Sequence, residues 1–112
     1  MLQILKIIAA VVTLATGVYS LLFPLAVRGF TGLEMPGPRG ITEVRAVLGG
    51  AFIGLGLAAL LLNAPEAYRT VGIMYLVVGA VRIVSMIIDR SAVQSNWISL
   101  AFEAVLGLIL AL

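Results

Sequence analysis

Four long apolar runs, separated by short polar segments, account for most of the chain. They lie at residues 4–27, 44–63, 68–88 and 97–112. A helix needs roughly 20 apolar residues to cross the hydrocarbon core of a bilayer, so we predict four transmembrane helices with these boundaries. Short connections force neighbouring helices to run antiparallel. The pattern therefore predicts an all-α, integral membrane four-helix up-and-down bundle with both termini on the same side of the membrane.

The segments between the runs support this division. Residues 28–42 are rich in glycine and proline, which break helices, residues 63–66 form a tight turn, and residues 89–96 are a polar link. Arg28, Arg39 and Arg90 flank the side of the long loop, against Lys6 and Arg69 on the side of the termini. Because cytoplasmic loops carry an excess of Lys and Arg, we expect these loops to be cytoplasmic.

The first run superficially resembles a signal peptide, since Lys6 precedes an apolar stretch. That stretch continues to about Val27, past the length of a signal sequence, and lacks a convincing A-x-A cleavage site. We therefore interpret it as the first membrane helix, and the whole of residues 1–112 as one transmembrane domain.

The amino-acid composition excludes several kinds of chemistry for this chain. Hydrophobic residues make up 62% of the chain and charged residues 11%, and the mean hydropathy is +1.22. The chain has no Cys and no His, so disulfides, thiolate catalysis, His-ligated haem and the usual zinc sites are excluded. We expect no bound metal or cofactor, and no nucleic-acid partner, because the net charge of +2 includes no polybasic run.

A few ionisable residues lie inside or at the rims of the apolar runs, and threading the runs across a bilayer places them toward one membrane face. They are Glu43, Arg45, Arg82 and Glu103. A charge in hydrocarbon is costly, and several at one depth indicate a functional site.

Helical phase predicts which of these residues meet. Arg82 and Glu103 each lie about two turns below the same interface, so we predict an ion pair between them, with Glu43 close by. Arg45 lies almost opposite Glu43 on its helix and could snorkel to the interface. The hydroxyl groups available as hydrogen-bond partners are those of Ser20, Ser85 and Ser99.

The second helix carries a strip of small residues in line with Glu43. Gly50, Gly54 and Ala58 follow at spacings of four, which allows another helix to approach closely. We predict helix packing at this strip, and a homodimer face is an equal alternative.

The spacing of these residues resembles a known family. Glu43-x-Arg45, Leu48-Gly49-Gly50, Gly54-Leu55-Gly56, Gly79-x-x-Arg82 and Glu103 are similar to the small bacterial four-helix membrane proteins of the domain of unknown function 4345 family, which look akin to the DoxX-like group. The resemblance implies that Arg45 belongs to one site with Glu43, Arg82 and Glu103. It also implies that the protein lies in a bacterial inner (plasma) membrane. Some DoxX-like relatives are membrane subunits of quinone-linked oxidoreductases, which suggests a lipid-soluble small molecule or a larger partner.

Several functions are compatible with these residues. The leading hypothesis is a non-enzymatic protein in which Glu43, Arg45, Arg82 and Glu103 form a small-molecule or quinone-like ligand site. The alternative is an accessory or scaffold subunit of a larger membrane complex, or a homo-oligomer, in which the cluster is a structural ion-pair network. Ion translocation ranks last, because the half of the bundle near the termini has little polar lining.

Overall fold

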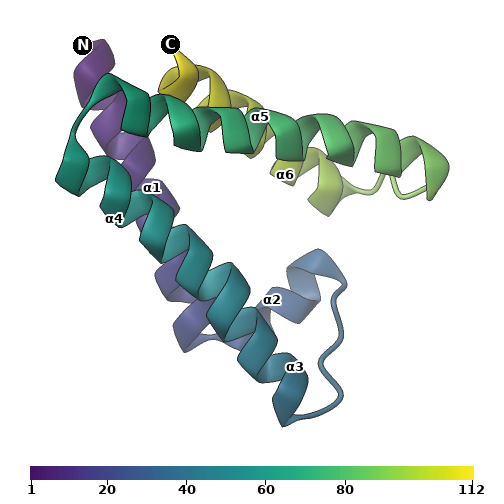
Figure 1. The fold of residues 1–112 in the computed structure, drawn as a ribbon. Coiled ribbons are helices and arrows are strands. Elements are labelled where there is room, and N and C mark those ends of the chain that lie inside the picture. The colour runs from purple at the N-terminus through teal and green to yellow at the C-terminus, as the bar shows by residue number, and fades with distance from the viewer. The chain divides into compact units, whose positions relative to one another are not determined.

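The computed structural model describes residues 1–112 and contains helices but no strands (Figure 1). The helices, in chain order, are α1 (Leu2–Leu22), α2 (Pro24–Thr31), α3 (Pro38–Glu43), the π-helix η1 (Val44–Gly50), α4 (Ala51–Leu62), α5 (Pro65–Ile88) and α6 (Gln94–Ala111). The all-α membrane class predicted from the sequence is confirmed.

Four helical segments are long and apolar enough to cross a membrane. They are Leu2–Leu22, Pro38–Leu62, Pro65–Ile88 and Gln94–Ala111. Many large apolar side chains face outward; Leu61, for example, is 79% exposed and Ile87 is 74% exposed. Apolar surface on this scale needs lipid rather than water around it. The chain is therefore an integral membrane protein that lies in a lipid bilayer.

The helices belong to two compact units. One consists of Met1–Ala9 with Asn63–Leu112 and the other of Ala10–Leu62, so α1 contributes to both. The expected single domain over residues 1–112 stays a prediction, and each unit is described by itself below.

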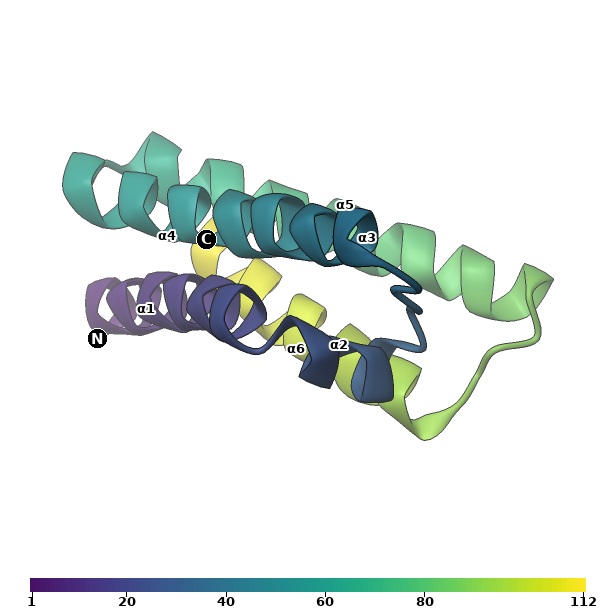
Figure 2. The same ribbon diagram turned by 90° about the horizontal axis from the view of Figure 1, so that it is seen from below.

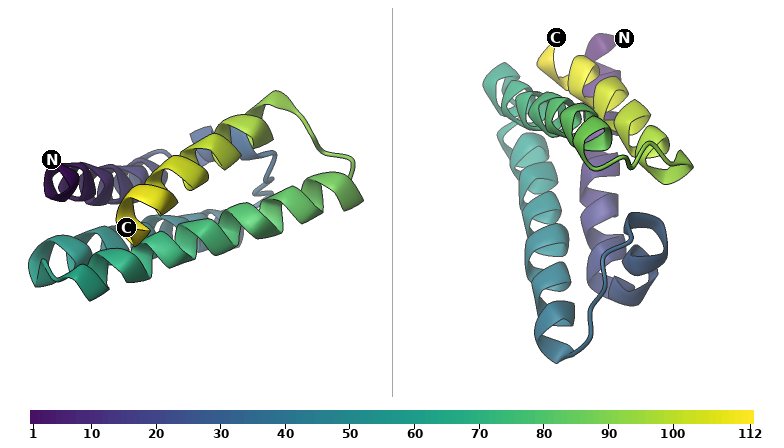
Figure 3. Two further views of the ribbon diagram at one scale, coloured as in Figure 1. Left: turned by 90° about the horizontal axis from the view of Figure 1, so that it is seen from above. Right: turned by 90° about the vertical axis from the view of Figure 1, so that its right-hand side faces the viewer.

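Within the unit Ala10–Leu62, α1 and α4 lie antiparallel and side by side (Figure 3, right). The two backbones approach so closely that side chains would not fit between them. A Cβ atom added at Gly17 would lie 2.6 Å from the carbonyl oxygen of Gly49, and one added at Gly56 would lie 2.7 Å from the backbone nitrogen of Leu14. Glycine is therefore required on both helices of this contact.

The first apolar run does not form one helix to residue 27, as predicted, but breaks at Leu22. Phe23 leaves the helical conformation, with φ −127° and ψ 60°, and Pro24 begins α2. Proline has no N–H to donate and its ring clashes with the preceding turn, so the helix must end and restart here. α2 then ends at Gly32, whose left-handed conformation (φ 76°) lets its N–H donate to the carbonyl of Arg28.

The segment 28–42, predicted as a connection without helix, contains the end of α2 and all but the last residue of α3. It packs against the start of the second span through a small apolar core. Val27, Met35 and Val44 are its buried members, with Ile41 and Leu48 partly buried beside them. This burial stabilises helical turns that the glycines and prolines disfavour.

The second span therefore begins at Pro38 and not at residue 44. α3, η1 and α4 follow one another without interruption, and Figure 2 shows them as one helical rod. In the middle of this rod, η1 has the wider turn of a π-helix over Val44–Gly50. A π-turn adds a residue to the turn and shifts the phase of everything that follows.

In the other unit, α5 and α6 form an antiparallel hairpin (Figure 3, left). Both helices begin earlier than the predicted residues 68 and 97. α5 begins at Pro65, whose missing N–H costs nothing in a first turn, and α6 begins at Gln94. The helices touch closely at Gly72, where an added Cβ atom would lie 2.5 Å from the backbone nitrogen of Ala111.

The turn between α4 and α5 is joined to the start of α1 by side-chain hydrogen bonds. Asn63 has a left-handed conformation, with φ 45°. Its Oδ1 atom accepts a hydrogen bond from Gln3 Nε2 at 3.1 Å and another from the Tyr68 hydroxyl at 2.7 Å. These bonds hold the first turn of α1 in the same unit as the α5–α6 hairpin.

Candidate functional site

The α5–α6 hairpin brings Arg82 and Glu103 together. Gly107 packs against Leu76, where an added Cβ atom would lie 2.8 Å from Leu76 Cδ2, and the space beside Gly79 is occupied by Glu103. These small residues set the separation and the register of the two helices. One turn beyond Gly79 on α5, Arg82 faces α6 at the level of Glu103.

The ion pair expected between these two residues is present. Arg82 Nε lies 2.9 Å from each oxygen of Glu103, and Arg82 Nη2 lies 2.5 Å from Glu103 Oε1. The Glu103 side chain is 9% exposed and that of Arg82 is 29% exposed. A carboxylate so deeply buried needs an opposite charge and several donors, and Arg82 supplies both.

Asn96 completes this group at the first turn of α6. Its Oδ1 atom accepts a hydrogen bond from Arg82 Nη1 at 2.9 Å, and its Nδ2 atom donates to the carbonyl of Ser91 at 2.8 Å. Asn96 therefore links the guanidinium to the turn between the helices. Asn96 and Glu103 are seven residues apart, so helical spacing alone puts them on the same face of α6. That spacing did not predict the hydrogen bond between Asn96 and Arg82.

The pair retains capacity to bind a further polar group. A guanidinium has five N–H groups, and the contacts with Glu103 and Asn96 engage one each on Nε, Nη1 and Nη2. One N–H on each terminal nitrogen remains, and the net charge of the pair is zero. Such a site suits an uncharged acceptor such as a carbonyl oxygen.

Two serines lie about one turn from the pair along the two helices, and their role as hydrogen-bond partners at the site stays a prediction. Ser85 lies one turn after Arg82 on α5, and Ser99 lies one turn before Glu103 on α6. Both residues are partly buried, and neither hydroxyl makes a hydrogen bond within the protein. The hairpin thus holds two hydroxyl groups beside the ion pair that are available to a ligand.

The other predicted site residues belong to the unit Ala10–Leu62. Glu43 is exposed and forms an ion pair with Arg39, and Arg45 is exposed and has no hydrogen-bond or ion-pair partner. Ser20 is buried and donates to the carbonyl of Thr16 at 3.1 Å, so its hydroxyl is satisfied by its own helix. That these residues join Arg82 and Glu103 in one constellation stays a prediction.

Helix packing uses different glycines from the predicted strip of Gly50, Gly54 and Ala58. No atom lies within 4 Å of a Cβ added at Gly50 or Gly54, whereas Gly49 and Gly56 touch α1. One physical reason is the π-helix, because the expected line from Glu43 to Gly50 assumed an uninterrupted α-helical period. The use of this strip as a face for a second copy stays a prediction.

Lys6 is a polar residue that sequence reasoning treated only as an interfacial charge. It is 6% exposed, and its amine makes no hydrogen bond or ion pair within the protein. Its position three residues after Gln3, on the same face of α1, is the signal that could have identified it, since Gln3 bonds to Asn63. No group of His, Cys, Asp and Glu side chains is arranged to hold a metal ion.

The fold and this charged hairpin define a small all-α membrane protein with four apolar spans and a buried Arg–Glu pair. Its whole length, residues 1–112, matches the family described as Domain of unknown function (DUF4345), and the chain belongs to that family. No curated protein and no solved structure matches the chain.

Proposed function

We propose that the protein binds the polar head of a small, uncharged, lipid-soluble molecule at the α5–α6 hairpin, within a bacterial inner membrane, and that it is not an enzyme. The observation that carries the proposal is the partly exposed Arg82, neutralised by Glu103, with one N–H left on each terminal nitrogen. The hydroxyls of Ser85 and Ser99 add donors and acceptors beside it.

A quinone head group fits this chemistry. Its carbonyl oxygens accept hydrogen bonds from Arg82 and from the two serines, and its ring and tail suit an apolar surrounding. A neutral ligand leaves the charge balance of Arg82 and Glu103 intact, whereas an anion would compete with Glu103 for the guanidinium. The resemblance to the DoxX-like group, some of whose members serve quinone-linked oxidoreductases, agrees with this choice by analogy.

Trp97 provides the test, because it is the single tryptophan of the chain and follows Asn96 directly. A short-chain benzoquinone titrated into the protein in lipid nanodiscs should quench Trp97 fluorescence in a saturable manner. In the double variant Arg82→Leu with Glu103→Leu, which removes both charges together, only the linear quenching caused by partition into lipid should remain. Saturable quenching that persists in this variant would place the ligand elsewhere.

Two further variants separate ligand binding from folding. Ser85→Ala combined with Ser99→Ala leaves the ion pair intact and should weaken quinone binding by about thirtyfold, as expected for two lost hydrogen bonds of about 1 kcal/mol each. Arg69→Leu, an exposed arginine on the same helix, serves as the matched control and should bind as wild type. If all variants bind equally, the proposal fails.

A structural role for the pair is the second candidate, and one observation favours it. Every deeply buried side-chain nitrogen and oxygen has a hydrogen-bond partner within the protein, so the pair is stable without a ligand. In that case the protein would be an accessory or scaffold subunit, or a homo-oligomer, with the open strip at Gly50 and Gly54 as its docking face. Native mass spectrometry of the protein in mild detergent separates the two, since it reports bound small molecules and bound chains together.

A further inference from the structure

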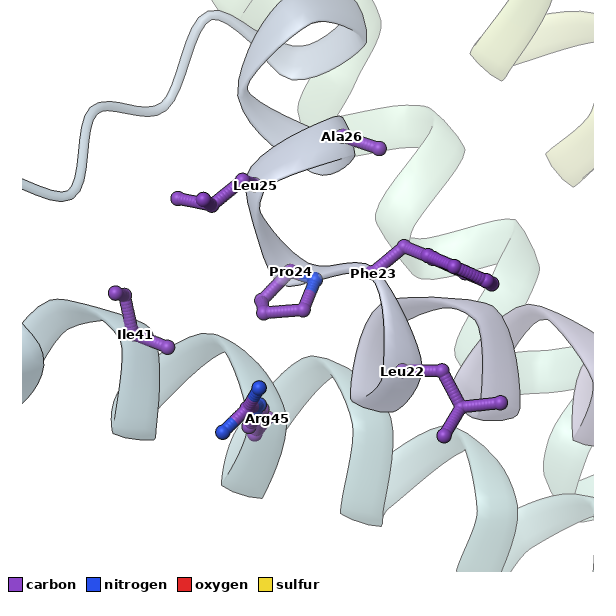
Figure 4. Close-up of a pocket in the computed structure, with 7 residues that line it drawn as sticks. All are labelled: Leu22, Phe23, Pro24, Leu25, Ala26, Ile41 and Arg45. Carbon is purple, nitrogen blue, oxygen red and sulfur yellow. The ribbon is translucent and has the colours of Figure 1, made fainter.

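A hollow lies in the unit Ala10–Leu62, at the break between α1 and α2. It has a volume of about 330 Å³ and is lined by Leu22, Phe23, Pro24, Leu25, Ala26, Ile41 and Arg45 (Figure 4). The break at Pro24 turns α2 away from the axis of α1 and opposite Ile41 and Arg45 of the second span. The hollow is thus a consequence of the proline that ends α1.

The lining is apolar except for one cation. Six of the residues are hydrocarbon or aromatic, and Arg45 is the only member with a charge. Its guanidinium has no hydrogen-bond or ion-pair partner, and Glu43, the acid nearest to it in the sequence, pairs with Arg39. The hollow therefore combines an apolar surface with an unneutralised positive charge, in contrast to the neutral pair of Arg82 and Glu103.

Its depth in the membrane matches the level of lipid phosphates. α1 has 21 residues, which span about 31 Å at 1.5 Å per residue, close to the thickness of the hydrocarbon core. Residues 22–26 therefore lie at the interface on the side of the long loop. Arg45, in the second turn of the second span, reaches the same level by extending its side chain toward the interface.

We propose that this hollow binds an anionic phospholipid, with the phosphate on Arg45 and the upper part of one acyl chain against Leu22, Phe23 and Ile41. The volume is at the lower end of ligand sites, which suits part of a chain and not a whole lipid. A free anion would make no use of the apolar lining, and a zwitterionic lipid brings its own cation, which weakens the attraction of its phosphate to Arg45. The proposal is independent of the quinone site on the other unit.

The experiment compares an anionic lipid with a zwitterionic lipid that has identical chains. The purified full-length protein in mixed micelles, with phosphatidylglycerol and phosphatidylcholine supplied equally, is analysed by native mass spectrometry. Wild type should retain phosphatidylglycerol over phosphatidylcholine by about fivefold, the amount expected for one arginine near a membrane surface. Arg45→Gln should abolish the preference, while Arg28→Gln, an exposed arginine of α2 outside the hollow, should preserve it.

Two further arms identify the occupant. Ala26→Trp fills the hollow without changing any charge, and it should lower phosphatidylglycerol retention to the level of Arg45→Gln. Soluble glycerol 3-phosphate should neither bind nor displace the lipid, because it has no acyl chain. Equal retention of the two lipids, an unchanged preference in Arg45→Gln, or binding of glycerol 3-phosphate alone would each overturn the proposal. The melting temperature of each variant, followed by far-ultraviolet circular dichroism, verifies that it is folded.

Discussion

At the scale of single residues, stability depends on how each buried charge is satisfied. Glu103 and Arg82 satisfy each other within one hairpin, and Asn96 adds a third group. Removing one member of such a pair leaves the other as an uncompensated charge in an apolar interior, whereas removing both does not. Lys6 differs from this pair, because the residue is 6% exposed as a whole and its amine has no partner within the protein.

Glu103→Leu should therefore destabilise the protein far more than the double change with Arg82→Leu. We expect a loss of about 3 kcal/mol for the single variant and recovery of most of that loss in the double variant. Unfolding in mixed micelles of increasing denaturing detergent, followed by Trp97 fluorescence, measures both values. Equal losses in the single and double variants would mean that the two side chains do not depend on each other.

Lys6→Met should stabilise the protein. Methionine keeps the length and the apolar stem of lysine but removes an amine that has no partner from a residue that is 6% exposed, and we expect a gain of about 1 kcal/mol. Arg69→Met, which removes an exposed charge, is the matched control and should change the stability little. A lower stability for Lys6→Met in the same unfolding experiment would show that the amine has a favourable contact in the membrane.

At the scale of helices, close packing depends on which small residues face a neighbour. Gly49 and Gly56 are seven residues apart and touch α1, whereas Gly50 and Gly54 face open space. Each set lies on one face of the helix by its spacing, although only Gly50 and Gly54 are four residues apart, and lipid is as apolar as a protein interior. Periodicity alone therefore could not distinguish the contact face from the open one.

Gly56→Ala and Gly54→Ala form a matched pair that tests this assignment. The added methyl at Gly56 would lie 2.7 Å from Leu14 N and 2.9 Å from Ala10 O, so α1 and α4 must separate, and we expect a loss of about 2 kcal/mol. The methyl at Gly54 meets nothing, and alanine should add a few tenths of a kcal/mol through its better helix propensity. If Gly54→Ala destabilises the protein more than Gly56→Ala does, the assignment of Gly56 to the contact with α1 is wrong. A selective loss of dimer in Gly54→Ala would instead identify the open strip as a face for a second copy.

At the scale of the whole molecule, four spans joined by short connections predict that both termini and the α4–α5 turn lie on one side of the membrane. The segment between α2 and α3 and the turn between α5 and α6 then lie on the other side. The chain has no cysteine, so single cysteines introduced at chosen positions report their own accessibility without further changes.

We expect Gly37→Cys and Ala92→Cys to react with a membrane-impermeant maleimide from one side, and Gln3→Cys and Ala64→Cys from the other. The excess of arginine near the loops predicts that the first pair is protected in intact cells and labelled only in inverted vesicles. Reaction of Gly37→Cys and Ala92→Cys from opposite sides would contradict the four-span topology. Labelling of both Gly37→Cys and Ala92→Cys in intact cells would show that the predicted orientation is wrong, and it would leave the four-span topology uncontradicted.

Hydropathy and helical period were sufficient for the features that depend on local sequence. Four runs of about 20 apolar residues have few alternatives to spanning helices, because every backbone polar group must be satisfied within the membrane. The same period placed Arg82 and Glu103 at one depth on facing helices, and the ion pair between them is present. The all-α class and this pair therefore followed from the sequence alone.

Features that depend on contacts between distant segments required the tertiary structure. The sequence predicted one helix through Pro24, whereas the structure breaks there and continues as α2 and α3 around the core of Val27, Met35 and Val44. Other features likewise depend on neighbours that are remote in sequence. They are the π-turn of η1, the contact face at Gly49 and Gly56, the role of Asn96 and the burial of Lys6. The physical reason is that apolar residues surround each helix almost completely, so the sequence determines which segments enter the membrane, and packing decides which face of each helix meets another.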